Sequence, residues 1–266
     1  MNLLHAIVLA IVEGLTEFLP VSSTGHMALV SAFFGIEKSD FTKLFIENIQ
    51  FGTIISVIVL YWRKFFDFKK LQFYVKLLVA FLPAAVFGVI FKKHIDELIG
   101  SPLFIAIVMF LGGIVLLFVD NWFKNPQIYS EEKITYKKSF FIGLFQVLAV
   151  LFPGLSRSAA TIIGGMQQKL TRTAAAEFSF FLAVPTLAGA FAKSLWDAYK
   201  DTPEILTSHN ISILALGNLI GFIVAIIAIK AFISFLTKHG FRLFGYYRIV
   251  VGFIIIACLL WGKFNF

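Results

Sequence analysis

The sequence predicts an all-α polytopic membrane protein with two inverted-topology repeats, each a re-entrant helix–break–helix hairpin plus three transmembrane helices. Three observations support this fold class: the composition, six long apolar stretches, and two apolar stretches interrupted at proline. Of the 266 residues, 59% are apolar or aromatic and 14% are charged, whereas a soluble domain carries about 25% charged residues. A soluble domain of this size needs a polar surface, so the composition excludes a water-soluble globule and favours one surrounded by lipid.

Charge and cysteine content exclude further classes of protein. The formal net charge is +8, but the Lys and Arg residues lie between apolar runs and form no stripe. Membrane lipids are therefore the expected partner, and nucleic acid is not. The single cysteine, Cys258, excludes an intrachain disulfide and a cysteine metal cluster. The N-terminal run lacks the basic start and cleavage site of a signal peptide, so we expect it to be part of the fold.

Six apolar stretches are long enough to cross about 30 Å of hydrocarbon as helices. They lie near residues 44–62, 74–92, 103–119, 174–192, 211–229 and 246–262. Two others are interrupted: 3–19 runs into Pro20 and resumes at 26–36, and 139–152 runs into Pro153 and resumes at 158–168. Proline removes a helix hydrogen bond, and pieces of about 11 residues are too short to span. Each interrupted stretch is therefore predicted to form a helix, a polar break and a second helix.

Basic loops predict the orientation of these elements, because positive residues concentrate in cytoplasmic loops. The Lys and Arg residues cluster at 63–70, 124–138, 169–172 and 230–248, the last cluster ending at Arg248. The second and third clusters flank the stretch at 139–168, so both of its ends are expected on the cytoplasmic side. The stretch at 3–36 is expected to enter and return from the outside.

The interrupted stretches occupy matching places in two halves of the chain, each followed by three spans. An odd number of crossings inverts one half relative to the other, an arrangement that frames a midplane site in many transporters. Aligning Pro20 with Pro153 pairs Ser23 with Ser156. The expected single membrane domain has a first repeat over 1–120, a cytoplasmic connector over 121–138 and a second repeat over 139–266.

The first break follows a pair of carboxylates. Glu13 and Glu17 are four residues apart on one helix face, where like charges repel, and near a helix C-terminus, which carries partial negative charge. A divalent cation such as magnesium or calcium would relieve both problems, since these hard cations bind carboxylate oxygens. The alternative is a pair that is solvated at the interface or protonated by burial.

Hydroxyl groups and a histidine follow Pro20. Ser22 and Ser23 precede the renewed helix, where a hydroxyl commonly caps the first turn. His26 lies three residues after Ser23, and we expect its imidazole to reach that hydroxyl, either to activate a nucleophile or to protonate a leaving group. The alternatives are capping for the hydroxyls and a purely structural role for the histidine.

The second break contains an arginine between hydroxyl residues, after a glycine. An arginine within an apolar hairpin faces the protein interior or a wet cavity and needs an anion. Its planar fork suits phosphate oxygens, and the start of the following helix offers free N–H groups to an anion. The residues expected to form this phosphate site are Gly154, Ser156, Arg157, Ser158 and Thr161.

Two more carboxylates, Glu47 and Glu177, lie in corresponding spans. Either is a candidate for orienting Arg157, His26 or the metal from behind. The alternative for Arg157 is an ion pair with one of them that serves structure only.

The segments EGLTEFLPVSSTGH at 13–26 and PGLSRS at 153–158, together with Thr161 and EFSF at 177–180, closely resemble the bacterial undecaprenyl-diphosphate phosphatases, also called bacitracin-resistance proteins. The resemblance implies a multi-pass hydrolase of the bacterial cytoplasmic (inner) membrane. It would remove the terminal phosphate of undecaprenyl diphosphate and so recycle the lipid carrier for peptidoglycan. The resemblance also implies a divalent cation, a site opening to the periplasmic side, a homodimer and bacitracin resistance.

The match implies active-site roles for Glu13, Glu17, Ser23, His26, Ser156, Arg157 and Thr161, and the reading of the residues themselves adds Ser22, Gly154 and Ser158. Glu17, Ser23, His26 and Arg157 are expected to be catalytic, and Glu13 and Glu17 to bind the metal. The residues expected to bind substrate are Ser22, Gly154, Ser156, Arg157, Ser158 and Thr161. The predicted mechanism is in-line displacement by Ser23 with His26 assisting, with water as the alternative nucleophile. The rival hypothesis is an anionic-lipid transporter or flippase without hydrolysis.

Overall fold

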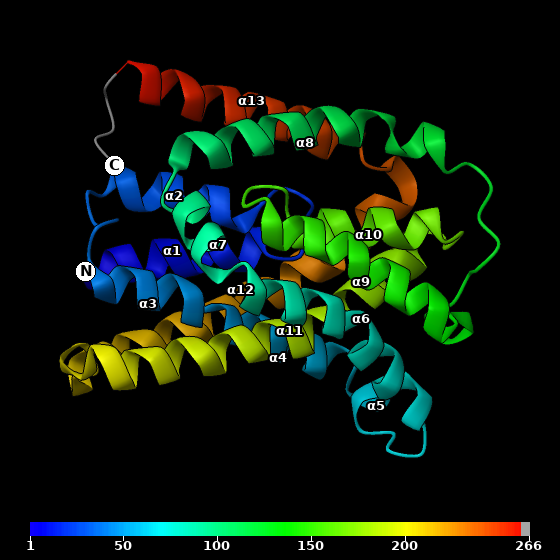
Figure 1. The fold of residues 1–266 in the computed structure, drawn as a ribbon, viewed down its shortest axis with the longest axis horizontal. Helices are drawn as coiled ribbons and strands as arrows, with labels where there is room; N and C mark the ends of the chain where they lie inside the picture. The colour runs from blue at the N-terminus through cyan, green and yellow to red at the C-terminus, as the bar shows by residue number, and fades with distance from the viewer. Residues whose placement is uncertain (262–266) are drawn as a thin grey trace.

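Residues 1–261 are described in the computed structural model, and they form an all-helical protein (Figure 1). Within this range there are α-helices α1 to α13 and two short 3-10 turns, with no β-strand. Six helical units in the described part of the chain are long and apolar enough to cross a membrane. The structure therefore fits a multi-pass membrane protein.

The six predicted spans are present, with different ends. They are α3 with α4 (Asp40–Asn48 and Gln50–Leu60), α6 (Leu71–Ile90), α8 (Pro102–Trp122), α11 (Arg172–Asp201), α12 (Ser208–His239) and α13 (Arg242–Leu260). The helices α11 and α12 are longer than the stretches predicted at 174–192 and 211–229. Most of the extra length lies at the C-terminal ends, where α11 continues to Asp201 and α12 to His239. An apolar stretch marks only the part of a helix that can face hydrocarbon, and the helical hydrogen bonds continue into the more polar turns beyond it.

Short helical segments connect the spans. They are α5 (Trp62–Phe65), α7 (Lys92–Ile99) and the 3-10 turns Glu131–Lys133 and Pro203–Ile205. The sequence did not predict α7, whose alternating charged and apolar residues leave no side chain buried.

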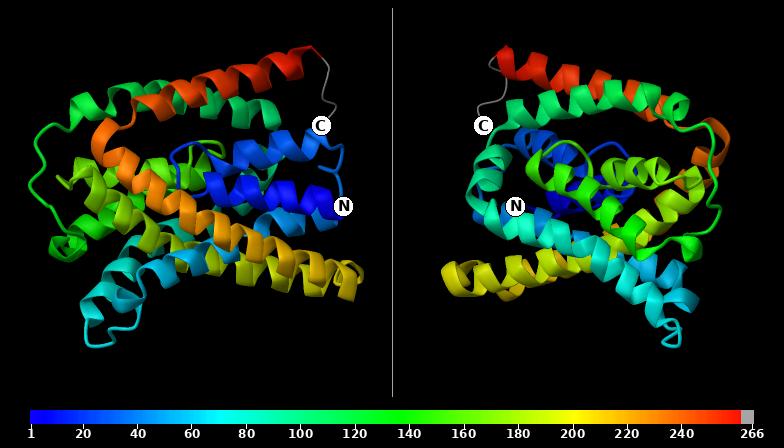
Figure 2. Two further views of the ribbon diagram at one scale, coloured as in Figure 1. Left: turned by 180° about the vertical axis from the view of Figure 1, so that it is seen from behind. Right: turned by 45° about the vertical axis from the view of Figure 1, so that its right-hand side comes forward.

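Two pairs of helices form the predicted helix–break–helix hairpins. They are α1 (Leu3–Thr16) with α2 (Ser23–Phe33), and α9 (Tyr136–Leu151) with α10 (Arg157–Gln167). In each pair the chain returns to the end of the molecule from which it came, and the two breaks meet near the centre (Figures 1 and 2). Pro20 and Pro153 lie in these breaks, as the sequence indicated.

Both second helices begin with the same cap. Ser22 and Ser156 adopt the left-handed backbone, with φ of 71° and 76°. Their Oγ atoms accept hydrogen bonds from Gly25 N and Ala159 N, each at 3.3 Å. The pairing of Ser23 with Ser156 from the proline alignment is therefore wrong by one residue, because the cap follows the proline by two residues in the first break and by three in the second.

Helices of one half of the chain pack against helices of the other half. The helix α1 packs against α12, and its counterpart α9 packs against α6. The helices α8 and α13 pack against each other, and α4 contacts both α11 and α12. Each hairpin is thus held by a span from the opposite half, which brings the two breaks together.

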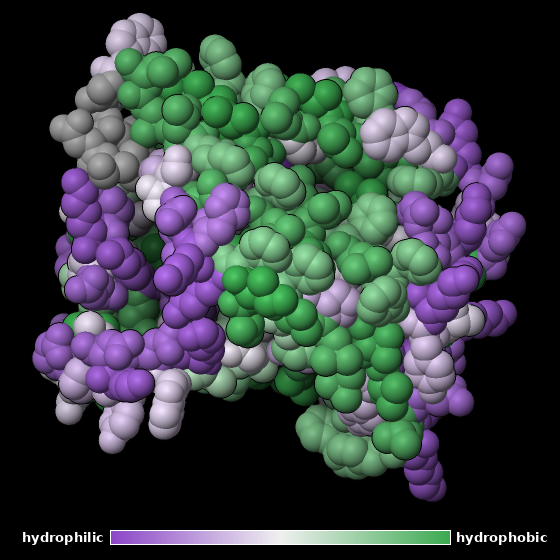
Figure 3. Space-filling view, viewed as in Figure 1, coloured by the Kyte–Doolittle hydropathy of each residue, from purple (hydrophilic) through white to green (hydrophobic). Residues whose placement is uncertain are grey.

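The surface is divided into bands. Hydrophobic side chains cover the middle of the face in Figure 3, and hydrophilic ones gather at its two ends. The basic segments at 63–70, 124–138 and 169–172 lie toward one end, and the turn between α11 and α12 lies toward the other (Figures 1 and 2). At the basic end, Lys70 donates to Glu132 at 3.1 Å, and this hydrogen bond lowers the pKa of the Glu132 carboxyl.

Arg248 is a correction to the predicted basic loops. It lies within α13, and none of its surface is exposed. Its guanidinium donates only to main-chain carbonyls among the described residues. It therefore belongs to the protein interior and not to a cytoplasmic loop.

We expect Gly143→Ala to destabilise the fold. A Cβ at Gly143 would overlap the Ala80 carbonyl where α9 crosses α6, whereas a Cβ at Gly88 would meet nothing closer than 3.8 Å. Overpacking of this kind costs about 1–3 kcal/mol. Thermal unfolding in detergent should therefore show a lower midpoint for Gly143→Ala than for the control Gly88→Ala. Equal midpoints would contradict the tight crossing.

Candidate functional site

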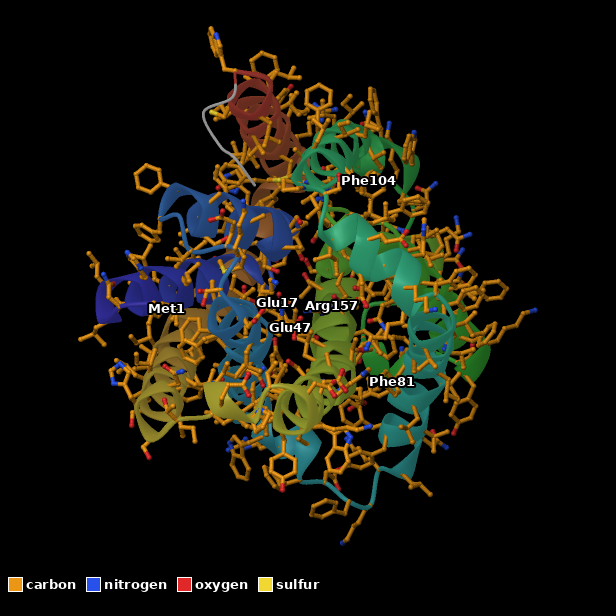
Figure 4. The ribbon with its side chains drawn as sticks, turned by 60° about the vertical axis from the view of Figure 1, so that its left-hand side comes forward. Met1, Glu17, Glu47, Phe81, Phe104 and Arg157 are labelled. Atoms are coloured by element: carbon orange, nitrogen blue, oxygen red, sulfur yellow. The ribbon has the colours of Figure 1, made fainter. Side chains whose placement is uncertain are left out.

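An ion pair joins the two breaks at the centre of the molecule. Arg157 Nη2, at the start of α10, lies 2.7 Å from Glu17 Oε1, just after α1. Figure 4 shows the two residues in the central region between the hairpins. Their side chains are 12% and 5% exposed, so neither charge is left to solvent. The arginine also lies over the Phe18 ring, 5.7 Å from its centroid.

The other Glu17 oxygen binds the first residue of α2, the helix that follows the break. Ser23 Oγ donates to Glu17 Oε2 at 2.6 Å. One carboxylate therefore contacts both the hydroxyl predicted as the nucleophile and the arginine predicted to bind phosphate. A carboxylate that accepts a hydroxyl proton at this distance is placed to act as a general base.

His26 does not contact Ser23 as predicted. Its Nδ1 lies 2.7 Å from the Ser22 carbonyl oxygen, and its Nε2 lies 2.7 Å from the Tyr247 hydroxyl. Because a carbonyl only accepts, Nδ1 must carry the proton, and Nε2 of the neutral ring accepts from the tyrosine. The expected Ser23–His26 pair is wrong, since the first turn of α2 directs the imidazole back along the backbone and toward α13.

Arg157 also binds α11, the helix that follows its hairpin. Its Nη1 donates to the Ser179 carbonyl at 3.1 Å. Thr161 Oγ1 donates to the Arg157 carbonyl at 2.9 Å and lies 2.6 Å from Ser179 Oγ. The Arg157 Nε is buried without a partner in residues 1–261. The arginine thus keeps one buried N–H that a bound anion would satisfy.

The other predicted phosphate residues have mainly structural contacts. Ser158 Oγ donates to the Leu19 carbonyl at 2.8 Å, and both Ser158 and Thr161 are fully buried. Ser156 Oγ caps α10 and lies 3.0 Å from Ser158 Oγ. Gly154 has a φ of 98°, and a side chain there would overlap the Ile105 carbonyl. Direct contact of Ser158 and Thr161 with a substrate is therefore not supported by this geometry.

The surroundings of Glu13 show whether the site fits a divalent cation. Glu13 is fully buried, with 0% of its surface accessible to solvent. It lies close enough to Glu17 for their charges to interact. Neither of its carboxylate oxygens has a hydrogen-bond partner in the described residues. Within residues 1–261, no three or more His, Cys, Asp or Glu side chains are grouped so that they alone could hold a metal ion. Two carboxylates suit a cation that takes its other ligands from water and substrate phosphate, as magnesium does.

Glu47 and Glu177 do not orient the site as predicted. Glu47 Oε2 accepts a hydrogen bond from Ser194 Oγ, and Glu177 interacts with Tyr61. Glu47 lies in the central region of Figure 4, but its carboxylate is hydrogen-bonded to α11 and not to Arg157 or His26. The apolar spans around Glu47 and Glu177 indicated that these residues lie at membrane depth, but the sequence did not show which neighbours their side chains contact.

Two residues of the site were missed by sequence analysis. Tyr247 holds His26, and Arg248 donates to the Pro20, Gly154 and Leu155 carbonyls. A usable signal was present, because Arg248 lies inside an apolar stretch just as Arg157 does, and an arginine in that setting needs an interior partner.

Comparison with known proteins identifies the family of this chain. The sequence profile described as bacitracin resistance protein BacA matches residues 6–254. The chain belongs to this family. It is 59% identical over 256 residues to the undecaprenyl-diphosphatase of Flavobacterium psychrophilum, covering 96% of this chain and 95% of that protein. It is 50% identical over 278 residues to the undecaprenyl-diphosphatase of Porphyromonas gingivalis, covering 98% of each.

We expect Tyr247→Phe to destabilise this BacA family member more than Tyr246→Phe. Loss of the Tyr247 hydroxyl leaves the buried Nε2 of His26 without its donor, which costs about 1–3 kcal/mol. Tyr246 is the neighbouring residue and is 58% exposed, so it is a matched control. Thermal unfolding in detergent measures both, and identical curves would mean that the contact adds nothing to stability.

Proposed function

We propose that this chain is an undecaprenyl-diphosphate phosphatase that hydrolyses undecaprenyl diphosphate to undecaprenyl phosphate and inorganic phosphate. The observation that carries the proposal is the Glu17 carboxylate, which contacts both Ser23 and Arg157 where the two breaks meet. The family membership and the names of the relatives support the same activity. Hydrolysis of this lipid returns the carrier for peptidoglycan synthesis and opposes bacitracin.

The diphosphate binds where the two second helices begin. The starts of α2 and α10 direct backbone N–H groups and partial positive charge toward the breaks. Arg157 adds a cation whose Nε lacks a partner in residues 1–261. The caps Ser22 and Ser156, with Gly154, shape the backbone that receives the phosphate groups. The apolar band in Figure 3 is the kind of surface that an isoprenoid tail requires.

Glu13 and Glu17 would hold a divalent cation, magnesium or calcium. Both Glu13 oxygens lack a hydrogen-bond partner among the described residues, and the Glu17 carboxylate lies close enough for the two charges to interact. When bound, the cation would polarise phosphoryl oxygens and offset their negative charge. It would also relieve the repulsion between the two carboxylates.

Ser23 is the nucleophile in this proposal. Its Oγ attacks the terminal phosphorus, and its proton passes to Glu17 Oε2, which lies 2.6 Å away. The bond from that phosphorus to the bridging oxygen breaks, and undecaprenyl phosphate leaves with the bridging oxygen. Water then hydrolyses the phosphoserine, which releases inorganic phosphate and restores Ser23. Arg157 stabilises the charge on the transferring phosphoryl group, and His26 positions the Ser22 carbonyl.

Phosphate release by purified protein in detergent tests the activity. A flippase needs two compartments and releases no phosphate, so release of phosphate from undecaprenyl diphosphate separates the two hypotheses. We expect release to stop with a chelator and to resume with added magnesium or calcium.

The variant Glu13→Gln should require far more cation for phosphate release, because an amide is a weaker ligand than a carboxylate. Chelator-resistant release, or an unchanged cation titration in Glu13→Gln, would remove the metal from the proposal.

The covalent intermediate gives a second test. Acid quench of enzyme turning over substrate labelled in its terminal phosphate should leave label on the peptide containing Ser23. The Ser23→Ala variant should carry none, whereas Thr24→Ala, which changes the exposed hydroxyl next to it, should be labelled like the parent. Turnover by Ser23→Ala at a rate close to the parent would favour direct attack by water.

Inverted repeats of re-entrant hairpins account for the reciprocal packing. The contact of α1 with α12 matches that of α9 with α6, and Ser22 and Ser156 form equivalent caps. These observations support a first repeat over 1–120, a connector over 121–138 and a second repeat over 139–266. The charge distribution places the basic end in the cytoplasm. The family resemblance implies an inner-membrane enzyme whose site opens to the periplasm. The homodimer stays a prediction of the family resemblance.

Single cysteines test the orientation. In a Cys258→Ala background, Glu204→Cys and Lys69→Cys place exposed thiols at opposite ends of the molecule. We expect an impermeant thiol reagent to label Glu204→Cys in intact cells, and Lys69→Cys only after the membrane is opened. Labelling of both variants in intact cells would contradict the topology.

A further inference from the structure

We propose that Arg248 is a positioning residue that fixes both helix breaks of the site at once. This inference rests on the proposed function, because it assigns Arg248 a role in that same site. The residue lies in α13, outside both hairpins, and its side chain is fully buried. It forms no hydrogen bond with the side chains of Glu17, Ser23 or Arg157. It acts through the backbone that carries them.

The hydrogen bonds of Arg248 converge from three segments. Its Nη1 lies 2.8 Å from the Leu155 carbonyl oxygen and 3.4 Å from that of Pro20. Its Nη2 donates to the Gly154 carbonyl at 2.9 Å, and its Nε donates to the Met109 carbonyl of α8 at 3.1 Å. One rigid guanidinium thus ties the first break, the second break and a span together.

The carbonyls that Arg248 holds come directly before the predicted site residues. Leu155 precedes Ser156 and Arg157, and Pro20 precedes the Ser22 cap by two residues. In a trans peptide the carbonyl and the next N–H point in opposite directions. Drawing the Leu155 carbonyl toward Arg248 therefore turns the Ser156 N–H to the opposite side, toward the open start of α10. The clamp sets which side of the break offers donors to an anion.

Arg248 also keeps its positive charge near the breaks. All its hydrogen-bond acceptors in residues 1–261 are main-chain carbonyls, and no carboxylate pairs with it there. Charge that is not neutralised by an ion pair favours an anion nearby, and it acts more strongly in a buried setting than in water. The adjacent Tyr247 holds His26 from the same turn of α13, so this turn contacts both hairpins.

Lysine cannot replace this clamp. Its ammonium is a single point with three donors, whereas the guanidinium spreads its donors over a fixed plane. Gly112 allows a second perturbation that leaves Arg248 in place, because a Cβ at Gly112 would overlap Arg248 Nη2. The matched controls are Arg242→Lys, an exposed arginine at the start of the same helix, and Gly88→Ala, where a Cβ has room.

The experiment compares Arg248→Lys, Gly112→Ala and the double variant with both controls. We expect Arg248→Lys to lower kcat for phosphate release by about tenfold or more and KM to change much less, since positioning acts on the transition state. Gly112→Ala should lower kcat in the same way. The double variant should be no worse than Arg248→Lys alone, because both changes act through one guanidinium. The controls should match the parent.

Hydrogen exchange gives a readout that does not need activity. Peptides covering the breaks at 17–25 and 152–158 should exchange faster in Arg248→Lys and in Gly112→Ala than in the controls. Unchanged kcat per folded molecule, losses that multiply in the double variant, or unchanged exchange at both breaks would overturn the proposal. If Arg248→Lys does not fold, Gly112→Ala decides alone. A parent protein that releases no phosphate would refute the proposed function, while the exchange result would still test the clamp.

Discussion

The ion pair between Glu17 and Arg157 is the interaction on which the site depends. It joins residues that are far apart in the sequence and lie in opposite halves of the chain, and both side chains are almost fully buried. Removing one partner of such a pair leaves an uncompensated charge and costs about 3–5 kcal/mol. The pair therefore requires the two breaks to stay together, and its position beside Ser23 explains how the same contact can serve chemistry.

The membrane sets a second constraint, which is the pairing of backbone groups at the breaks. Interrupted helices expose carbonyl and N–H groups that lipid cannot satisfy. Here Ser158 donates to the Leu19 carbonyl across the breaks, and Arg248 donates to carbonyls of both. Both Glu13 oxygens and Arg157 Nε are buried without a hydrogen-bond partner among the described residues. These groups are the ones that an internal site leaves for a ligand.

Local features of the fold could be predicted from the sequence because their causes are local. Proline and the hydroxyl caps marked both breaks, and apolar length marked the six spans. The positions of Glu17, Ser23 and Arg157 near one another followed from placing both breaks at one site. The partner of His26 could not be predicted, because Tyr247 is distant in the sequence and the direction of the imidazole depends on the backbone of the first turn. Arg248 was assigned to a loop for the same reason, since only tertiary packing shows that α13 lies against both breaks.

The most direct measurement is a double-mutant cycle between Glu17 and Arg157. It compares kcat/KM for phosphate release in Glu17→Gln, Arg157→Lys and the double variant. If the two residues act as one unit, the double variant should lose little more than the worse single variant. Losses that multiply would show that each residue acts independently, and would contradict a site built on their contact.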